Sequence, residues 1–479
     1  MPIRSRLPQA LLVGSLVTLG LPVMSFAESL PDALAEAYAS NPSLQAQRAQ
    51  LRATDEEYVQ AEVGYRPTVS ATESYTYSYV DTPPTTATTT NGTAGGLTVT
   101  QPLYTGGRVA RQLDAAQADI FAGRAALRRT ETDVLLSVIQ AYLDVRRERE
   151  TLEIRDSVIQ VLGHQVEQAN ASFTAGDGTR TDIAQAEARL AQARSDRAAT
   201  EADLQAAVSA YTAVVGHAPG DLAPEPSLAA LLPPTPDAAF DLAETNNAAL
   251  AQARFAEQAA AARVAEAKAA NRPTVGVSGS FGYTSGAVVV DGQLLNPGAT
   301  GGLFSNVAPN ATVMVTASIP VFTGGLNSSQ IRQTAELAEA ARVGVEGVRR
   351  QVTQAVATGW ERLLGERERI DAVQQQVKAD ELAFEGVGEE KKAGYRTELD
   401  VLNAEQELAA SRLTLVSAEH DEYLTTATLL TVIGTLTVKS LVPTEAAYDP
   451  ASHYRKVTHA PGWVPWSPAV GALDRLGAP

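Results

Sequence analysis

The residue types that most often carry catalysis or bind metals are few in this chain, and they are dispersed. The sequence contains no cysteine, no G-x-S-x-G nucleophile turn and no phosphate-binding glycine loop. Its histidines are scattered without the spacing of a metal site. They are His164, His217, His420, His453 and His459. We therefore expect neither enzymatic activity nor a bound cofactor or metal.

The charged residues with the most suggestive placement follow a glycine late in the chain. Arg396 and Asp400 come shortly after Gly394, and Asp182 holds the position equivalent to Asp400 in an earlier, similar segment. Carboxylates of several copies that converge on one axis would repel anions and concentrate cations. Alternatively, the two aspartates only stabilise helix starts electrostatically. The nearby Gly176-Asp177-Gly178 is interpreted as a turn rather than as a binding loop.

A duplication of the chain indicates which elements position these residues. Arg66-Pro67-Thr68-Val69 recurs as Arg272-Pro273-Thr274-Val275, at an offset of 206. Thr105-Gly106-Gly107 recurs as Thr323-Gly324-Gly325 at an offset of 218, and the segment that ends at Asp182 recurs at the same offset. The second copy therefore has 12 additional residues between its first two motifs. We expect a loop there, because insertions are tolerated in exposed loops.

Both copies predict the same order of elements. A helix interrupted near its middle comes first, two strand-like segments joined by a polar loop follow, and a very long helix, a turn and a shorter helix complete the copy. The interruptions are at Asn41-Pro42 and Asn246-Asn247. The helices are predicted over residues 30–63, 108–173 and 181–215 in the first copy, and over 237–270, 326–391 and 399–433 in the second.

The ends of the chain and the joint between the copies differ in composition from the repeats. Arg4 and Arg6, an apolar run and the small residues of Ser25-Phe26-Ala27 predict a signal peptide that is cleaved before Glu28. A Pro-rich linker separates the copies. The predicted division is a signal peptide at 1–27, a first repeat at 28–218, the linker at 219–236, a second repeat at 237–442 and a tail at 443–479.

Composition excludes several classes of protein. No stretch of 18 or more apolar residues follows the signal peptide, so no membrane-spanning helix is predicted. Without cysteine, an acylated N-terminal cysteine is impossible. The net charge of -17 argues against nucleic acid as a partner.

The long helices carry a seven-residue repeat that predicts coiled-coil packing. In the first copy the repeated positions are Val138, Val145, Leu152, Ile159, Val166 and Phe173, and six positions of the second copy align with them. At 1.5 Å per residue, each predicted helix of 66 residues is roughly 100 Å long. An ordinary globular domain does not need helices of this length.

The strand segments alternate apolar residues with small polar ones. Val313, Val315 and Ala317 alternate with Thr316 and Ser318, and the other three segments follow the same pattern. Segments of this kind are typical of an outer-membrane β-barrel, although a half-buried soluble sheet gives the same alternation. Four strands cannot close a barrel, so several chains would have to pool them, and three chains would supply twelve. The alternative is a soluble periplasmic or secreted structural coiled-coil protein.

Together these features resemble the TolC family of outer-membrane channels, over roughly residues 30–442. The resemblance rests on repeated motifs before and after the strands and on the turn that precedes Asp400. These motifs are Tyr65-Arg66-Pro67, Asn271-Arg272-Pro273, Pro102-Leu103-Tyr104-Thr105-Gly106-Gly107, Pro320-Val321-Phe322-Thr323-Gly324-Gly325 and Gly394-Tyr395-Arg396-Thr397. Tyr448-Asp449-Pro450 with His453-Tyr454 resembles the subgroup associated with type I protein secretion.

The resemblance implies a mixed α and β membrane protein that assembles as a homotrimer. Each chain would give four strands to a 12-stranded barrel in outer-membrane lipid and its helices to a periplasmic tube. The channel would be the exit duct for an inner-membrane ABC or proton-driven pump and its periplasmic adaptor, in type I protein secretion or small-molecule efflux. The linker and the tail would form an equatorial belt around the tube.

The resemblance also implies roles for individual residues. Arg396 and Asp400 match positions that gate the periplasmic entrance, and Asp182 would be a partner for Arg396. Asn403 stands where relatives often have a second aspartate, so a cation block would be weaker. Lys391 stands where relatives can have a tyrosine that locks the entrance. The strand–helix junctions would be formed by Pro102, Gly106, Gly107, Pro320, Gly324 and Gly325.

Overall fold

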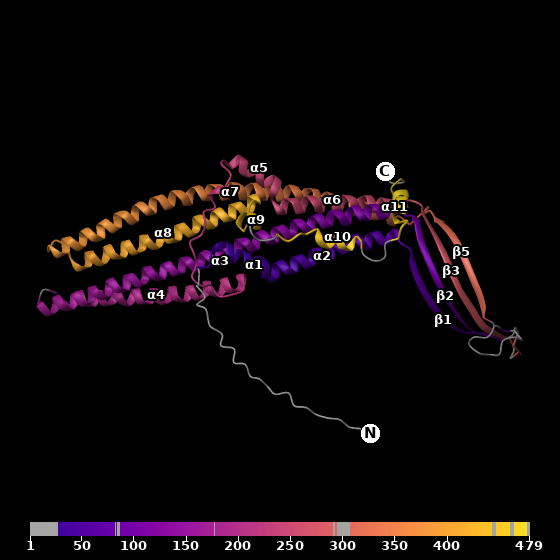
Figure 1. The fold of residues 1–479 in the computed structure, drawn as a ribbon, viewed down its shortest axis with the longest axis horizontal. Helices are drawn as coiled ribbons and strands as arrows, with labels where there is room; N and C mark the ends of the chain where they lie inside the picture. Colours follow the sequence, from indigo (N-terminus) through magenta and orange to yellow (C-terminus); the bar gives the residue numbers. More distant parts are fainter. Residues whose placement is uncertain are drawn as a thin grey trace, which may run out of the picture.

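The computed structural model describes residues 27–81, 83, 87–176, 178–290, 293–294, 307–442, 447–459 and 464–476. The predicted signal peptide, apart from Ala27, lies outside the described residues. The chain is elongated, with helix hairpins at one end and a β-sheet at the other (Figure 1). Within the described ranges, no helix has both the length and the apolar character needed to cross a membrane.

The elements follow one another in the same order in the two halves of the chain. The first half contains α1 (Leu30–Ser40), α2 (Pro42–Glu62), η1 (Val63–Tyr65), β1 (Thr68–Val80), β2 (Thr88–Tyr104), α3 (Arg108–Ala175) and α4 (Arg180–Val215). The second contains α5 (Pro236–Asn246), α6 (Ala248–Ala269), β3 (Thr274–Val290), β4 (Gln293–Leu294), β5 (Ala308–Ser318), α7 (Leu326–Lys392) and α8 (Glu398–Ile433). The connecting and C-terminal segments contain η2 (Ala229–Leu231), α9 (Val438–Leu441), α10 (Ser452–Val457) and α11 (Ser467–Leu476).

An asparagine in each half explains the predicted interruption of the first helix. The side-chain oxygens of Asn41 and Asn247 each accept a hydrogen bond at 2.9 Å from a backbone N–H in the first turn of the next helix, which makes them N-caps. Their amide groups donate to the carbonyl oxygens of Val214 (3.2 Å) and Val432 (2.8 Å). Each helix break is thereby fastened to the end of the shorter helix in the same half.

The four long strands form one antiparallel sheet in the order β1-β2-β3-β5, and the short β4 pairs with the end of β3. Pro102 lies in β2 opposite Gly276, at an irregularity in the register just before Tyr104. Proline has no N–H to give to a neighbouring strand, so it is tolerated at such a position. The hairpin of the second half has the longer connection, residues 291–307 against 81–87 in the first.

The two faces of the sheet differ in chemistry because directly opposed residues share a face. One face is apolar, with Val69 opposite Val99 and Val277 opposite Val315. The other face carries small polar residues along each strand. Glu73 is an exception on the apolar face, where its carboxylate accepts a hydrogen bond from the Tyr283 hydroxyl at 2.8 Å.

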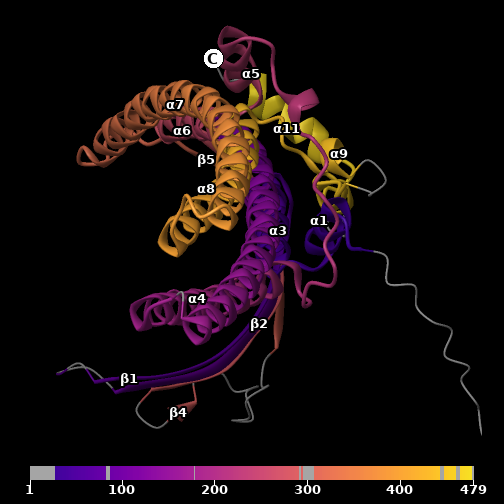
Figure 2. The same ribbon diagram turned by 90° about the vertical axis from the view of Figure 1, so that its left-hand side faces the viewer.

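The main hydrophobic core lies midway along the helices. It joins α1 to the middle of α3 and to the ends of α4 and α8, with Val138, Val145 and Tyr142 fully buried. Burial along the heptad seam then decreases toward the hairpin end, where the side chain of Phe173 is 40% exposed. The helices form an arc, and α1, α9 and α11 lie on its convex side (Figure 2).

Candidate functional site

The turns at the ends of the two helix hairpins contain the predicted entrance residues (Figure 1). Gly394 follows α7 with a φ of +84°, a left-handed conformation that favours glycine. Thr397 then caps α8: its backbone N–H and its hydroxyl each donate to the Asp400 carboxylate at 2.8 Å, and its Oγ1 accepts from the Asp400 N–H at 3.2 Å. Thr179 and Asp182 make the same capping box at the start of α4.

Both aspartates therefore take part in the capping boxes that begin α4 and α8. Hydrogen bonds from Thr179 lower the pKa of Asp182, and hydrogen bonds from Thr397 lower the pKa of Asp400, with a smaller contribution from Arg396. The two carboxylates thus stay ionised at neutral pH. A ring of charge requires further copies of the chain, so the selectivity role of Asp400 stays a prediction.

Arg396 lies in the same turn, but within the chain it is not brought to Asp182. Its Nε donates to Glu390 at 2.8 Å, which joins the turn to the last helical turns of α7. This hydrogen bond raises the pKa of Arg396. A contact between Arg396 and Asp182 of different copies stays a prediction.

Lys391 makes the contact that connects the two hairpins near their ends. Its Nζ donates to the side-chain oxygen of Gln168 on α3 at 2.9 Å and forms an ion pair with Glu398 at the start of α8. The lysine therefore ties the α7–α8 hairpin to the α3–α4 hairpin. At the position where the resemblance implies a tyrosine in relatives, this chain has a cation that bridges the two hairpins; a locking role stays a prediction.

A second polar tie between the hairpins involves Asn403. Arg189 on α4 donates to the Asn403 side-chain oxygen at 3.4 Å and also contacts Gln406. Sequence reasoning identified Asn403 but not Arg189, Gln168 or Gln406. Nothing in the duplication marks them, because each pairs with a residue on a helix of the other hairpin.

Little apolar surface supports these polar ties. Beside them a small cluster joins α3, α4 and α8, and it contains Leu162, Leu190, Ala193 and Leu402. Glu405 lines an adjoining cavity of about 220 Å³, and burial raises the pKa of its carboxyl. If the helices packed closely enough to fill this cavity, the Glu405 carboxyl would lose its contact with water. Burying it would cost more free energy than burying an apolar side chain in the same position. The hairpin ends are thus held together mainly by polar contacts.

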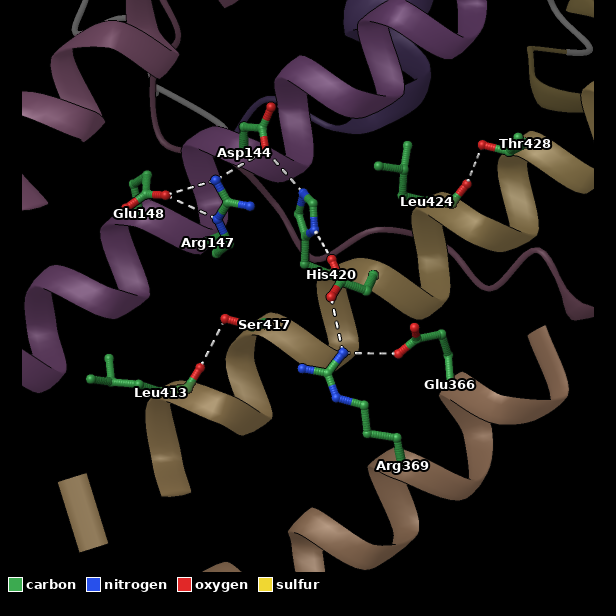
Figure 3. A network of polar contacts seen from close by, with 11 residues as sticks. Asp144, Arg147, Glu148, Glu366, Arg369, Leu413, Ser417, His420, Leu424 and Thr428 are labelled. Atoms are coloured by element: carbon green, nitrogen blue, oxygen red, sulfur yellow. Dashed lines mark hydrogen bonds and ion pairs between the residues drawn. The ribbon is translucent and has the colours of Figure 1, made fainter. Parts of the chain in front are cut away.

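Midway along the helices, a polar network connects α3, α7 and α8 (Figure 3). The buried His420 of α8 lies with Nε2 3.0 Å from Asp144 of α3 and with Nδ1 3.1 Å from Asp421. Asp421 in turn accepts from Arg369 of α7 at 3.1 Å. Burial disfavours the charged imidazole, but the hydrogen bonds to Asp144 and then Asp421 outweigh it, and the pKa of His420 is raised. His420 therefore holds α8 to α3 most firmly when it is protonated.

The first strand–helix junction is built on two glycines and is closed by the C-terminal helix. Gly106 and Gly107 have φ values of +72° and +82°, which turn the chain from β2 into α3. The fully buried carboxylate of Asp474 in α11 accepts from the backbone N–H groups of Thr105 (2.7 Å) and Gly107 (3.0 Å). It also accepts from the hydroxyls of Thr105 (2.9 Å) and Tyr65 (3.1 Å).

The second junction has the same backbone but different surroundings. Gly324 and Gly325 have φ values of +63° and +85°, and among the described residues no heavy atom beyond their chain neighbours lies within 4 Å of the position a Cβ would take. Pro320 follows the end of β5, and the neighbouring Phe322 is 88% exposed. The two predicted junctions therefore share their glycines, while only the first carries the Asp474 contacts.

The C-terminal segment lies along α2, where it holds the residues of the predicted secretion motif. Arg48 of α2 lies between the rings of Tyr38 and Tyr448, with its Cζ 4.6 and 4.8 Å from the two ring centres. His453 Nδ1 lies 3.2 Å from the buried carboxylate of Asp55. These contacts fasten the segment to α2, whereas a belt around a tube stays a prediction.

Comparison with known proteins identifies the family. A family model described as outer membrane efflux protein matches residues 33–217 and 239–435. The chain belongs to this family. It is 36% identical over 448 residues to the outer membrane efflux protein BepC of Brucella suis, covering 94% of each chain. It is 24% identical over 435 residues to the outer membrane protein TolC of Escherichia coli K12, covering 88% of this chain and 85% of TolC.

The fold agrees with solved structures of outer membrane proteins. The chain matches the structure of VceC from Vibrio cholerae with a TM-score of 0.70 and 22% identity, over 85% of this chain and 96% of VceC. At this identity the likeness shows the fold alone. The predicted TolC-family resemblance and the predicted class of long helices with membrane strands are confirmed. As a member of the outer membrane efflux protein family, the chain is an outer-membrane channel protein, and the family is not one of enzymes.

Proposed function

We propose that three copies of this chain form one channel-tunnel that crosses the outer membrane and extends into the periplasm. The observation that carries the proposal is the state of the sheet edges. In the described part of the chain, the outer strand β1 pairs only with β2, and the outer strand β5 pairs only with β3. The outer edges of β1 and β5 are therefore both open. An open edge cannot lie in lipid, because its N–H and C=O groups would lack partners. Pooling four strands from each of three chains closes a twelve-stranded barrel.

The channel is the exit duct of a tripartite export system, with a periplasmic adaptor and an inner-membrane ABC or proton-driven pump as partners. The length of α3, 68 residues or about 100 Å, suits a tube that reaches far from the membrane. The cargo is exported protein, small molecules or both. Export through a cleaved signal peptide brings the chain to its membrane.

The hairpin ends form the gate of this duct. The main core lies at mid-length, whereas the ends are joined by the Lys391–Gln168 and Arg189–Asn403 contacts and a small apolar cluster. A hydrogen bond from a charged donor contributes about 1.5–3 kcal/mol when well shielded, and we take about 1 kcal/mol at this partly exposed end. Breaking one such tie shifts the closed-to-open ratio about fivefold.

The proposal is tested with the purified protein in detergent and in planar bilayers. We expect a particle with three chains and a channel of low resting conductance. Lys391→Met should raise the conductance, whereas Lys392→Met should not, because Lys392 pairs with Glu389 on its own helix. A particle with one or two chains would refute the trimer, and equal conductance of the two lysine variants would refute the tie.

Two further variants separate the gate from ion selectivity. Asp400→Ala should lower cation selectivity if its carboxylates ring the entrance in the trimer. Arg396→Ser should raise conductance less than Lys391→Met, because Arg396 is bound to Glu390 of its own hairpin. If cation selectivity were unchanged in Asp400→Ala, Asp400 would not contribute to ion selection and would only cap α8.

A further inference from the structure

The C-terminal helix α11 lies where the strands meet the helices. It sits beside the base of the sheet (Figure 1) and on the convex side of the arc of helices (Figure 2). Its ten residues pack on the end of β2, on the start of α3 and on η1. This position is at the boundary between the membrane part and the helical part of the chain.

The side of α11 that faces the protein is the one that carries its polar residues. Ser467, Val470 and Asp474 are buried, and they follow the spacing of one helix face. Asp474 accepts four hydrogen bonds from Thr105, Gly107 and Tyr65. The Asp474 carboxylate is thus fully engaged with the junction.

The side of α11 that faces away from the protein is apolar. Trp466, just before the helix, is 48% exposed and Leu473 is 56% exposed, and Ala469 and Ala472 between them are also exposed. Arg475 is the one exposed charged side chain among the described residues of the helix. On a helix in water the polar side would face outward, so this arrangement is inverted.

The outward side of α11 continues the apolar face of the sheet. Gln101 shares a strand face with Leu97 and Val99, because alternate residues of a strand point the same way. Trp466 Nε1 donates to the Gln101 side-chain oxygen at 3.0 Å. The tryptophan therefore lies next to the side chains that form the lipid-facing band of the proposed barrel.

We propose that α11 and Trp466 form an interfacial anchor that binds the periplasmic leaflet of the outer membrane. Trp466, Ala469, Ala472 and Leu473 would enter the boundary between headgroups and acyl chains. Tryptophan is favoured at this depth, since its ring is apolar and its N–H finds a polar partner. Arg475 would meet the lipid phosphates. The Asp474 contacts fix the helix on the protein, so the anchor is held rigidly at the level of the junction.

The test uses the full-length protein reconstituted into vesicles of phosphatidylethanolamine and phosphatidylglycerol. The chain has three tryptophans, so Trp360→Phe with Trp463→Phe leaves Trp466 as the sole tryptophan, which is excited selectively over the tyrosines. The matched control carries Trp463→Phe and Trp466→Phe and keeps Trp360, which packs with the core of α5, α7 and α8 far from the strands. We expect acyl chains brominated near their glycerol end to quench Trp466 and to leave Trp360 unchanged. Acrylamide in the water should quench Trp466 weakly.

Each other outcome would overturn the proposal. Strong quenching of Trp466 by acrylamide without quenching by brominated lipid would show that the helix faces water. Resistance to both quenchers would show that a neighbouring copy of the chain covers it. The measurement is independent of the gate, because it requires neither conductance nor the hairpin contacts.

Discussion

Replacing Asp474 with alanine removes the acceptor of four hydrogen bonds that hold α11 to the first strand–helix junction. The hydroxyls of Thr105 and Tyr65 can rotate toward other acceptors, but the backbone N–H groups of Thr105 and Gly107 stay buried and unpaired. An unsatisfied buried donor costs about 1–3 kcal/mol, so the two together cost about 2–6 kcal/mol. Water can satisfy them only when α11 detaches.

Detachment of α11 should therefore become at least about 25-fold more frequent in Asp474→Ala, since 1.4 kcal/mol corresponds to a factor of ten. Hydrogen exchange followed by mass spectrometry measures this opening peptide by peptide. We expect faster exchange in the peptides that contain α11 and residues 105–108, and unchanged exchange at the hairpin ends. Asp474→Asn should lie between the wild type and alanine, because it keeps one oxygen.

Arg475→Ala is the matched control, since it removes an exposed charge from the same helix. If exchange in α11 were equally fast in wild type and Asp474→Ala, the carboxylate would not be what holds the helix. If Arg475→Ala accelerated exchange as much as Asp474→Ala, general loss of helix stability would explain the effect.

The remaining predictions concern His420 and the junction glycines. The folded-state pKa of His420 lies above its ordinary value of 6.5, so its stabilising contribution is complete below pH 6.5 and is lost as the pH rises through the folded-state value. Thermal unfolding temperatures of the wild type should therefore fall as the pH rises above 6.5, and His420→Gln should flatten this dependence; a parallel profile would contradict it. In Gly106→Ala the left-handed backbone costs about 1–2 kcal/mol, and the new Cβ would also clash with the Cβ of Arg272 at 2.8 Å. In Gly324→Ala only the backbone strain is added, because among the described residues the new Cβ meets no neighbouring side chain. Gly106→Ala should thus lower the unfolding temperature more, and an equal decrease would show that Gly324 is packed in the assembly.

Local pattern was sufficient to predict most of the fold. The long helices begin at the predicted residues, Arg108 and Leu326, and end within two residues of the predicted ends. Glycine turns, capping threonines and a seven-residue period act within a few residues of one another, so the sequence shows them directly. The helices α9 to α11 were missed because they depend on packing against distant elements. The short β4 was missed because it pairs with the end of β3 inside the segment that was predicted to be a loop.

The site was predicted less completely, for the same physical reason. Asp182 and Asp400 were identified at the starts of helices, and the structure places both in capping boxes, which the sequence reasoning did not name. The Lys391–Gln168 contact joins residues 223 positions apart, and His420 lies 276 positions from Asp144. No local spacing encodes such pairs, which is why His420 counted among scattered histidines.

The contact between Asp474 and Thr105 also sets an order in time. The two residues are 369 positions apart, and α11 follows every other described element of the chain. Because a polypeptide is made from its N-terminus, the residues of the first junction exist before α11 does, and the junction can be fastened only when α11 is present. A chain that stopped before α11 would have all its strands and hairpins and still lack this closure. The junction is therefore closed only in a chain that includes α11.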